Sequence, residues 1–196
     1  MPQTIEAATV KFSESPCGSN NSGRHNILIA YASQLGTTGE VAEAIGEALC
    51  QAGNTVATKR VNNVKDLHGY DAVIVGSAIL YERWMPEAAK FVKANQKVLQ
   101  QLPVAYFFTC LALHTLNTQG DLAAKKYSDT LQALVPHVKP ASIGGFVGVL
   151  DYRKMGCISR VLMKIILCNK GIKEGDYRDW DAIRAWAEDT QLKLWE

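Results

Sequence analysis

The sequence has few cysteines, and none of them is spaced for a metal site. Five cysteines stand at positions 17, 50, 110, 157 and 168 of the 196 residues, with no CxxC pair and no Cys/His cluster. An odd number of cysteines without a secretory signal favours a reducing cytoplasm, in which most thiols fill the core. We therefore predict no metal centre and a cytoplasmic location.

Long apolar runs and a strong charge bias are also missing. No stretch approaches the ~20 apolar residues that a membrane-spanning helix needs, and the N-terminus lacks the basic and apolar regions of a signal peptide. A formal net charge of +2 and a pI near 8.2 give no indication of a nucleic-acid partner. The 47% hydrophobic content is instead typical of a globular domain with a full core.

The chain does contain a regular alternation of apolar runs and amphipathic stretches. Residues 1–25 are polar and are expected to form a flexible leader, followed by one domain over residues 26–196. Strands are predicted at 27–32, 55–61, 71–77, 103–109 and 142–149, and helices at 38–52, 86–100, 120–134 and 180–194. Leu122 and Leu192 are among the side chains expected to face inward from the last two helices. With right-handed crossovers, this alternation predicts an α/β fold with a doubly wound, five-stranded parallel sheet.

A short turn, residues 31–38 (YASQLGTT), links the first predicted strand to the first helix. The hydroxyls of Ser33, Thr37 and Thr38 would join the unpaired amides of a helix N-terminus, and Gly36 lets the backbone approach a ligand. The turn has no lysine or arginine, so it is not a Walker-type phosphate loop. These features suit a monophosphate such as that of FMN, with an ordinary capped turn as the alternative.

The same turn resembles the FMN-phosphate signature of the flavodoxin superfamily. Tyr31, Ser33, Gly36 and Thr38 match that signature, whereas Leu35 stands where flavodoxins commonly carry threonine. The resemblance implies the strand order 2-1-3-4-5 and FMN as the cofactor. The residues it assigns to the phosphate are Ser33, Gln34, Leu35, Gly36, Thr37 and Thr38.

A second set of residues is similar to the flavodoxin-type, quinone-dependent protoporphyrinogen oxidases. It comprises residues 76–81, Trp84, 86–88 and 91–93, together with a long segment before the final helix. This resemblance implies oxidation of a porphyrinogen, a step of haem synthesis, with a quinone as the electron acceptor. No catalytic side chain is identified by it.

The loop after the third predicted strand is expected to flank the flavin ring. Tyr81 and Trp84 offer flat faces for stacking, and the amides of Ala78 and Ile79 can reach the ring edge. The alternative is that these aromatic side chains only cover the end of the sheet.

The loop after the fourth predicted strand is the other candidate ring-binding segment. The resemblance assigns it backbone contacts to the ring more than side-chain contacts. His114 is a candidate proton shuttle or an exposed histidine without a role, and no neighbour in the sequence clearly activates a thiol in this loop. The backbone contacts are assigned to Thr109, Cys110, Leu111 and Ala112.

An insertion at about residues 150–179 precedes the final helix. Residues 150–172 hold five basic side chains against one acidic, a net charge of +4, which leaves −2 on the rest of the chain. A basic amphipathic segment suggests an anionic substrate or peripheral contact with the cytoplasmic face of a membrane. A helix docked on the sheet with a solvated basic face is the alternative.

Three kinds of function fit these features. The first is an FMN-dependent oxidoreductase acting on a porphyrinogen or tetrapyrrole-type substrate, with quinone reduction alone as a variant. The second is a flavodoxin-type electron carrier between proteins, and the third is a flavin-binding regulatory protein without turnover. Because carriers are typically acidic and lack a basic insertion, the charge pattern favours the enzyme.

Overall fold

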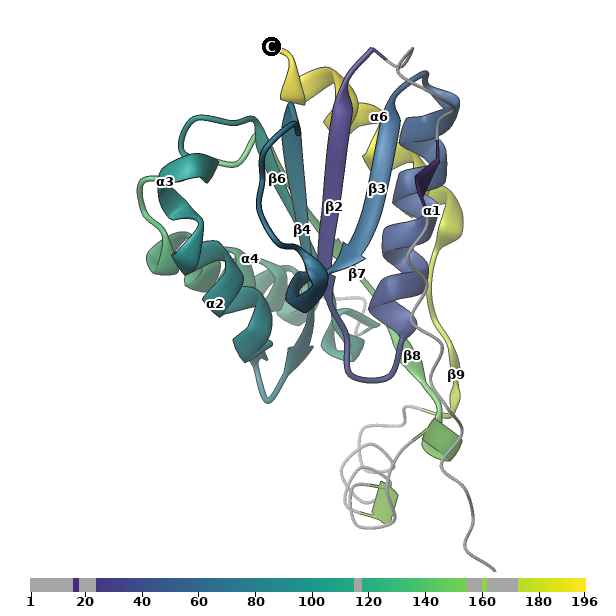
Figure 1. Ribbon diagram of the computed structural model, residues 1–196. Helices are drawn as coiled ribbons and strands as arrows, with labels where there is room; N and C mark the ends of the chain where they lie inside the picture. Colours follow the sequence, from purple (N-terminus) through teal and green to yellow (C-terminus); the bar gives the residue numbers. More distant parts are fainter. Residues whose placement is uncertain (1–15, 18–23, 115–117, 155–159, 162–172) are drawn as a thin grey trace, which may run out of the picture.

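A computed structural model describes residues 16–17, 24–114, 118–154, 160–161 and 173–196 (Figure 1). Most of the expected leader and most of the basic insertion therefore lie outside the described residues. None of the described helices combines the length and the apolar character needed to cross a bilayer.

The core of the molecule is a parallel sheet in the order β3-β2-β4-β6-β7, which confirms the predicted order 2-1-3-4-5. A short strand β1 pairs antiparallel with β3, so part of the expected leader belongs to the sheet edge. A second short strand, β5, pairs antiparallel with β4. The bounds are β1 Pro16–Cys17, β2 Asn26–Ala32, β3 Thr55–Arg60, β4 Ala72–Leu80, β5 Arg83–Trp84, β6 Val104–Thr109 and β7 Ser142–Phe146.

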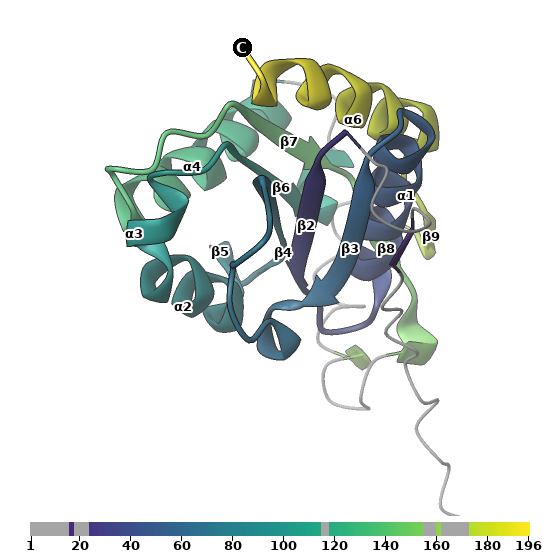
Figure 2. The same cartoon turned by 45° about the horizontal axis from the view of Figure 1, so that its top comes forward.

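Helices cover both faces of this sheet (Figure 2). The helices α1 (Thr37–Gln51) and α6 (Trp180–Leu194) lie on one face. The other face carries α2 (Pro86–Ala94), α3 (Gln96–Leu99) and α4 (Thr118–Leu134). Alternate side chains of β2 enter the two halves of the core, as in a strand buried on both sides.

Several expected boundaries were wrong. The helix predicted at 86–100 is broken at Asn95, whose side-chain amide donates to the Phe91 carbonyl 2.9 Å away. Leu122 and Leu192 are 65% and 69% exposed, so they do not face the core. In the last turns of α6, the buried positions are taken by Thr190 and Leu194 instead.

The cysteines also depart in part from the expectation of reduced core thiols. Cys110 is buried and free, as a core thiol should be. Cys50, at the end of α1, takes part in a disulfide bond.

The last predicted strand ends three residues early, at Phe146. The chain then turns away, and β8 (Val149–Leu150) pairs antiparallel with β9 (Gly175–Asp176) in a separate two-stranded ladder. A short 3-10 helix, η3 (Tyr152–Lys154), follows β8, and two others are η1 (Val61–Asn63) and η2 (Leu111–His114). The turn after β2, the β4–β5 hairpin, η2 and the β8–β9 ladder all lie at the lower edge in Figure 1, where the parallel strands end. Ligands of doubly wound sheets bind at this edge.

Candidate functional site

The turn between β2 and α1 contains a buried hydroxyl that has no hydrogen-bond partner. Ser33 is 1% exposed, and its Oγ is unpaired among the described residues. A buried, unpaired hydroxyl costs free energy, because it has lost its bonds to water without gaining others. An acceptor or donor that arrives with a ligand would remove this cost.

The helix that follows the turn begins without a side-chain cap. Its N-cap residue is Gly36, in the left-handed conformation with a φ of 86°, and no described side chain accepts a hydrogen bond from the first turn. An uncapped helix N-terminus leaves backbone amides and the positive end of the helix dipole available to an anion. A side chain at position 36 would strain this conformation, so glycine is required by the turn.

A hydroxyl pair joins this turn to the end of β6. Thr38 Oγ1 and Thr109 Oγ1 lie 2.8 Å apart in a buried hydrogen bond, and both residues are at most 5% exposed. The structure therefore brings together two sequence-predicted site residues that are 71 positions apart. The other members of the turn surround them, with Gln34 exposed and Leu35 and Thr37 half-buried.

The segment after β4 is a hairpin and not the open loop expected from the sequence. Ala78 is in register with Thr109 of β6, and Ile79 is in register with Trp84 of β5. The tip is formed by Tyr81 and Glu82, which both have positive φ angles, 49° and 61°. Tyr81 is 92% exposed and is thus available to a ligand or substrate, as its predicted role requires.

Trp84 does not occupy the position predicted for it. The side chain is 4% exposed and packs edge-on against the rings of Tyr106 and Phe108. Its Nε1 donates to the Tyr127 carbonyl 3.3 Å away, so the ring is fixed in the core with its polar atom satisfied. Trp84 is therefore a core side chain between the sheet and α4.

The loop after β6 forms η2, and two of its backbone amides already have partners. The Cys110 amide donates to the Phe146 carbonyl (2.9 Å), and the Ala112 amide donates to the Cys110 Sγ (3.4 Å). These two amides therefore already donate within the protein. Fewer backbone groups of this loop remain for the contacts to the flavin ring that the resemblance assigns to it. Ala112 is exposed and Leu111 is half-buried at the same edge.

Cys110 is a protonated thiol at neutral pH. Burial raises the pKa of this thiol above its ordinary value, and hydrogen bonds from the Ala112 amide and the Tyr127 hydroxyl offset burial only in part. The thiolate is the reactive form of cysteine. This thiol is a core side chain, as the absence of an activating neighbour suggested.

A structural element that the sequence did not reveal lies beside η2. We call it the neck: residues 149–153 and 173–178, which include the β8–β9 ladder. Leu150 is fully buried and packs with Leu111, Tyr152 and Tyr177. The Tyr177 ring lies 4.0 Å from the His114 ring, centroid to centroid. The neck thus packs against the candidate ring-binding loop, and it places His114 at this junction.

Arg178 of the neck binds helix α1 through Glu40. Its Nε donates to Asp176 Oδ1 at 2.8 Å, its Nη1 donates to Glu40 Oε2 at 2.5 Å, and the guanidinium lies 4.3 Å from the Trp180 ring centroid. The side chain is only 7% exposed. Burial lowers the pKa of Arg178, but the bonds to Asp176 and Glu40 outweigh burial and raise it overall, so the side chain stays charged.

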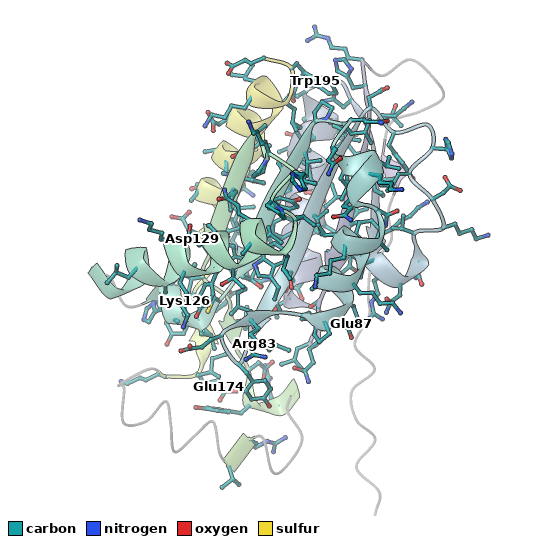
Figure 3. The ribbon with its side chains drawn as sticks, turned by 90° about the vertical axis from the view of Figure 1, so that its left-hand side faces the viewer. Arg83, Glu87, Lys126, Asp129, Glu174 and Trp195 are labelled. Carbon is teal, nitrogen blue, oxygen red and sulfur yellow. The ribbon has the colours of Figure 1, made fainter. Side chains whose placement is uncertain are left out.

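Charged groups of the hairpin and the neck gather at the same end of the molecule. Lys126 of α4 pairs with Glu82 at the hairpin tip, where both side chains are more than half exposed. Figure 3 shows Arg83, Lys126 and Glu174 at this end and Trp195 at the opposite end. The described residues contain no group of His, Cys, Asp and Glu side chains placed to hold a metal ion.

The residues of the turn fit the phosphate of FMN. The buried Ser33 hydroxyl lacks a partner, the α1 N-terminus lacks a cap, and Gly36 and Thr37 add a backbone approach and another hydroxyl. Together these groups supply donors for an anion without any basic side chain in the turn. The exposed Tyr81 and the loop 109–114 lie at the same sheet edge, which is where a flavin ring attached to that phosphate would reach.

Comparison with known proteins agrees with a flavodoxin-type fold. The family model of the flavodoxin domain matches residues 28–177. A protoporphyrinogen IX dehydrogenase [quinone] of Leishmania major is 26% identical over 175 residues, which cover 83% of this chain and 73% of that protein. The Escherichia coli K12 protein of the same name is 23% identical over 172 residues, covering 83% and 92%. A short-chain flavodoxin associated with a bacterial microcompartment superposes with a TM-score of 0.55 at 13% identity, over 87% of this chain and 99% of its own.

Proposed function

Because this chain belongs to the flavodoxin domain family, we propose that it is an FMN-dependent oxidoreductase that oxidises a porphyrinogen with a quinone as electron acceptor. The family implies FMN as the cofactor. The observation that carries the cofactor proposal is the buried, unpaired Ser33 hydroxyl beside an uncapped helix N-terminus. The substrate proposal is supported by the two relatives that bear the name protoporphyrinogen IX dehydrogenase [quinone].

In this proposal the protein binds and orients, and the cofactor carries the redox chemistry. Bound FMN would accept electrons from a reduced organic substrate and pass them to a separate acceptor. Ser33, the Thr37 hydroxyl and the first amides of α1 would hold the phosphate, and the Thr38–Thr109 bond would keep the turn against the end of β6. The loop after β6 would orient the ring edge, and Tyr81 would offer a flat, exposed face beside it.

The neck favours an enzyme over an electron carrier. A folded wall, centred on the buried Leu150, packs against the loop after β6, which we propose to orient the ring. A carrier needs an exposed flavin edge for protein partners, whereas an enzyme needs a surface that positions a substrate next to the ring. The net charge of +4 on residues 150–172 suits a substrate with carboxylate groups better than a basic protein partner.

Substrate turnover by the purified, FMN-loaded protein tests this function. We expect protoporphyrinogen oxidation that depends on an added quinone such as a menaquinone analogue. Quinone reduction by a nicotinamide donor, without porphyrinogen oxidation, would instead identify a quinone reductase. If neither reaction occurred while a flavodoxin reductase reduced the bound flavin rapidly, the protein would be an electron carrier.

We also propose that the basic segment, residues 150–172, contacts the surface of an anionic membrane in which a quinone is dissolved. The proposal is supported by the charge of this segment alone. Sedimentation with vesicles that contain an anionic lipid should show binding that weakens as the salt concentration rises. Equal binding to neutral vesicles, or none to anionic ones, would contradict it.

A further inference from the structure

The neck contacts two elements that lie beside the candidate FMN site. On one side, Arg178 binds Glu40 in the first turn of α1, four residues after the N-cap Gly36. On the other side, Tyr177 packs against His114 of η2, and Tyr177 and Leu111 both pack against Leu150. Two consecutive residues of the neck, Tyr177 and Arg178, therefore join the loop after β6 to the first turn of α1.

The contacts of Arg178 have the properties of a fixed junction. The guanidinium uses Nε and Nη2 on the two oxygens of Asp176 and Nη1 on Glu40, while one of its faces lies over Trp180. Planar, two-pronged bonds of this kind restrict orientation as well as distance. Because the side chain is 7% exposed, water screens these bonds much less than those of a surface ion pair.

The neck itself provides a matched comparison for Arg178. Arg153 makes the same local arrangement with an aspartate two positions earlier, donating from Nε to Asp151 Oδ1 (3.0 Å) and from Nη2 to Asp151 Oδ2 (3.2 Å). Its side chain is 87% exposed. The two arginines thus share their local motif and charge, but the contact with α1 belongs to Arg178.

We propose that Arg178 is a positioning residue that holds the neck against the ring-binding loop, so that the neck forms the substrate-side wall of the flavin site. This inference rests on the proposed function for its substrate. Its structural part, a dependence of the neck on Arg178, does not depend on which substrate is used. Arg178 itself donates to protein carboxylates, and its effect on the substrate passes through Tyr177 and Leu150.

Arg178→Gln, with Arg153→Gln as the control, tests the proposal in the FMN-loaded protein. In Arg178→Gln we expect amide hydrogens of the neck to exchange about tenfold faster, because a local contact that limits opening is lost. The KM for protoporphyrinogen should rise about five- to twentyfold with kcat within about twofold, because substrate positioning is lost and the cofactor is not touched. The FMN dissociation constant should change by less than about threefold. Arg153→Gln removes the same charge and should change neither the neck exchange nor the FMN dissociation constant. A rise in its KM would report only the basic charge lost from residues 150–172.

Glu40→Gln separates the junction from the folding of the neck. It leaves the Arg178–Asp176 pair in place and weakens the bond to α1, so it should speed neck exchange in the same peptides with the β8–β9 ladder intact. Arg178→Lys should restore the charge but only part of the protection, since lysine cannot bind two groups in a fork.

Three outcomes would overturn the proposal. One is an unchanged rate of neck amide exchange in Arg178→Gln. Another is an equally large increase of that rate in Arg153→Gln. The third is a tenfold or larger loss of FMN affinity in Arg178→Gln, which would place Arg178 in the cofactor site. If the wild-type protein failed to oxidise protoporphyrinogen, the proposed function would fall, while the exchange comparison would still decide the role of Arg178.

Discussion

Replacing Tyr81 by glycine should make the protein more stable. Tyr81 is the first tip residue of a two-residue hairpin and has a φ of 49°. A residue with a Cβ in the left-handed region is destabilised by roughly 1–2 kcal/mol, and glycine avoids this steric strain. Against this gain, the greater freedom of glycine in the unfolded chain lowers stability by about 0.5–1 kcal/mol. Because the ring is 92% exposed, its removal sacrifices little packing. The net gain is roughly 0.5–1 kcal/mol, or a rise in Tm of about 1–4 °C for a chain of this size.

Tyr81→Ala is the matched control for this strain. Alanine removes the ring but keeps the Cβ that is responsible for the steric cost, so its Tm should stay close to that of the wild type. Thermal unfolding of the three FMN-free proteins, followed by circular dichroism, measures the difference. Equal melting temperatures for the glycine and alanine variants would refute the claim that the hairpin tip is strained.

The same two variants test the predicted ring contact of Tyr81. Both lose the aromatic face, which is worth about 0.5–1.5 kcal/mol in a stacked pair. If Tyr81 stacks on the flavin, both should bind FMN about two- to tenfold more weakly. An unchanged FMN affinity with a raised KM would instead assign the ring to the substrate.

Other predictions follow from the core and from the phosphate turn. Gly76→Ala should cost about 1–3 kcal/mol in urea unfolding, because a Cβ there would lie 2.1 Å from the buried Phe107 ring; Gly148→Ala, which meets no atom within 4 Å, should be neutral. Ser33→Ala should weaken FMN binding about tenfold or more in a fluorescence titration yet leave the FMN-free protein as stable or more stable, because a buried unpaired hydroxyl is removed. The free energy of unfolding should fall as the pH rises above about 9, because burial raises the pKa of the Cys110 thiol above its ordinary 9.0, so the unfolded chain releases that proton first. Cys110→Ala should move this decline toward pH 10, the ordinary pKa of tyrosine, because burial also raises the pKa of Tyr106; an unmoved profile would exclude the thiol as its source.

The sheet and the strand–turn–helix unit around Gly36 could be predicted from the sequence because their signals are local. Residues 72–76 carry no polar side chain, which indicates a strand covered on both faces, and all five are buried. Gly36 and the hydroxyls that flank it stand next to each other in the chain. The strand order came from the family resemblance, and the observed register confirms it.

The hairpin could not be predicted because its tip lacks the usual turn residues. A two-residue hairpin normally carries Asn-Gly or a similar pair, and here Tyr81 and Glu82 occupy the left-handed positions. Without that signal, the segment after residue 77 had the appearance of a loop. The prediction for Trp84 differs from the structure for the same reason, because the unrecognised hairpin returns this residue to the core.

The neck could not be predicted because its contacts are long-range. Arg178 and Glu40 are 138 positions apart, and nothing near either residue indicates its partner. The sequence pattern also continued the fifth strand through residue 149, whereas the backbone leaves the sheet after Phe146. The one available signal was the pair of Asp-x-Arg motifs, Asp151/Arg153 and Asp176/Arg178, on the two limbs of the neck.

Comparing the affinities of the purified protein for FMN and for riboflavin tests most directly whether the turn from Ser33 to Thr38 holds the cofactor by its phosphate. The two ligands share the ring and differ only in the phosphate group. With several charge-assisted hydrogen bonds to that group, FMN should bind about a hundredfold more tightly or better, a difference of about 2.7 kcal/mol. Equal affinities, or no binding of FMN, would contradict the assignment of this turn and the flavin-dependent function built on it.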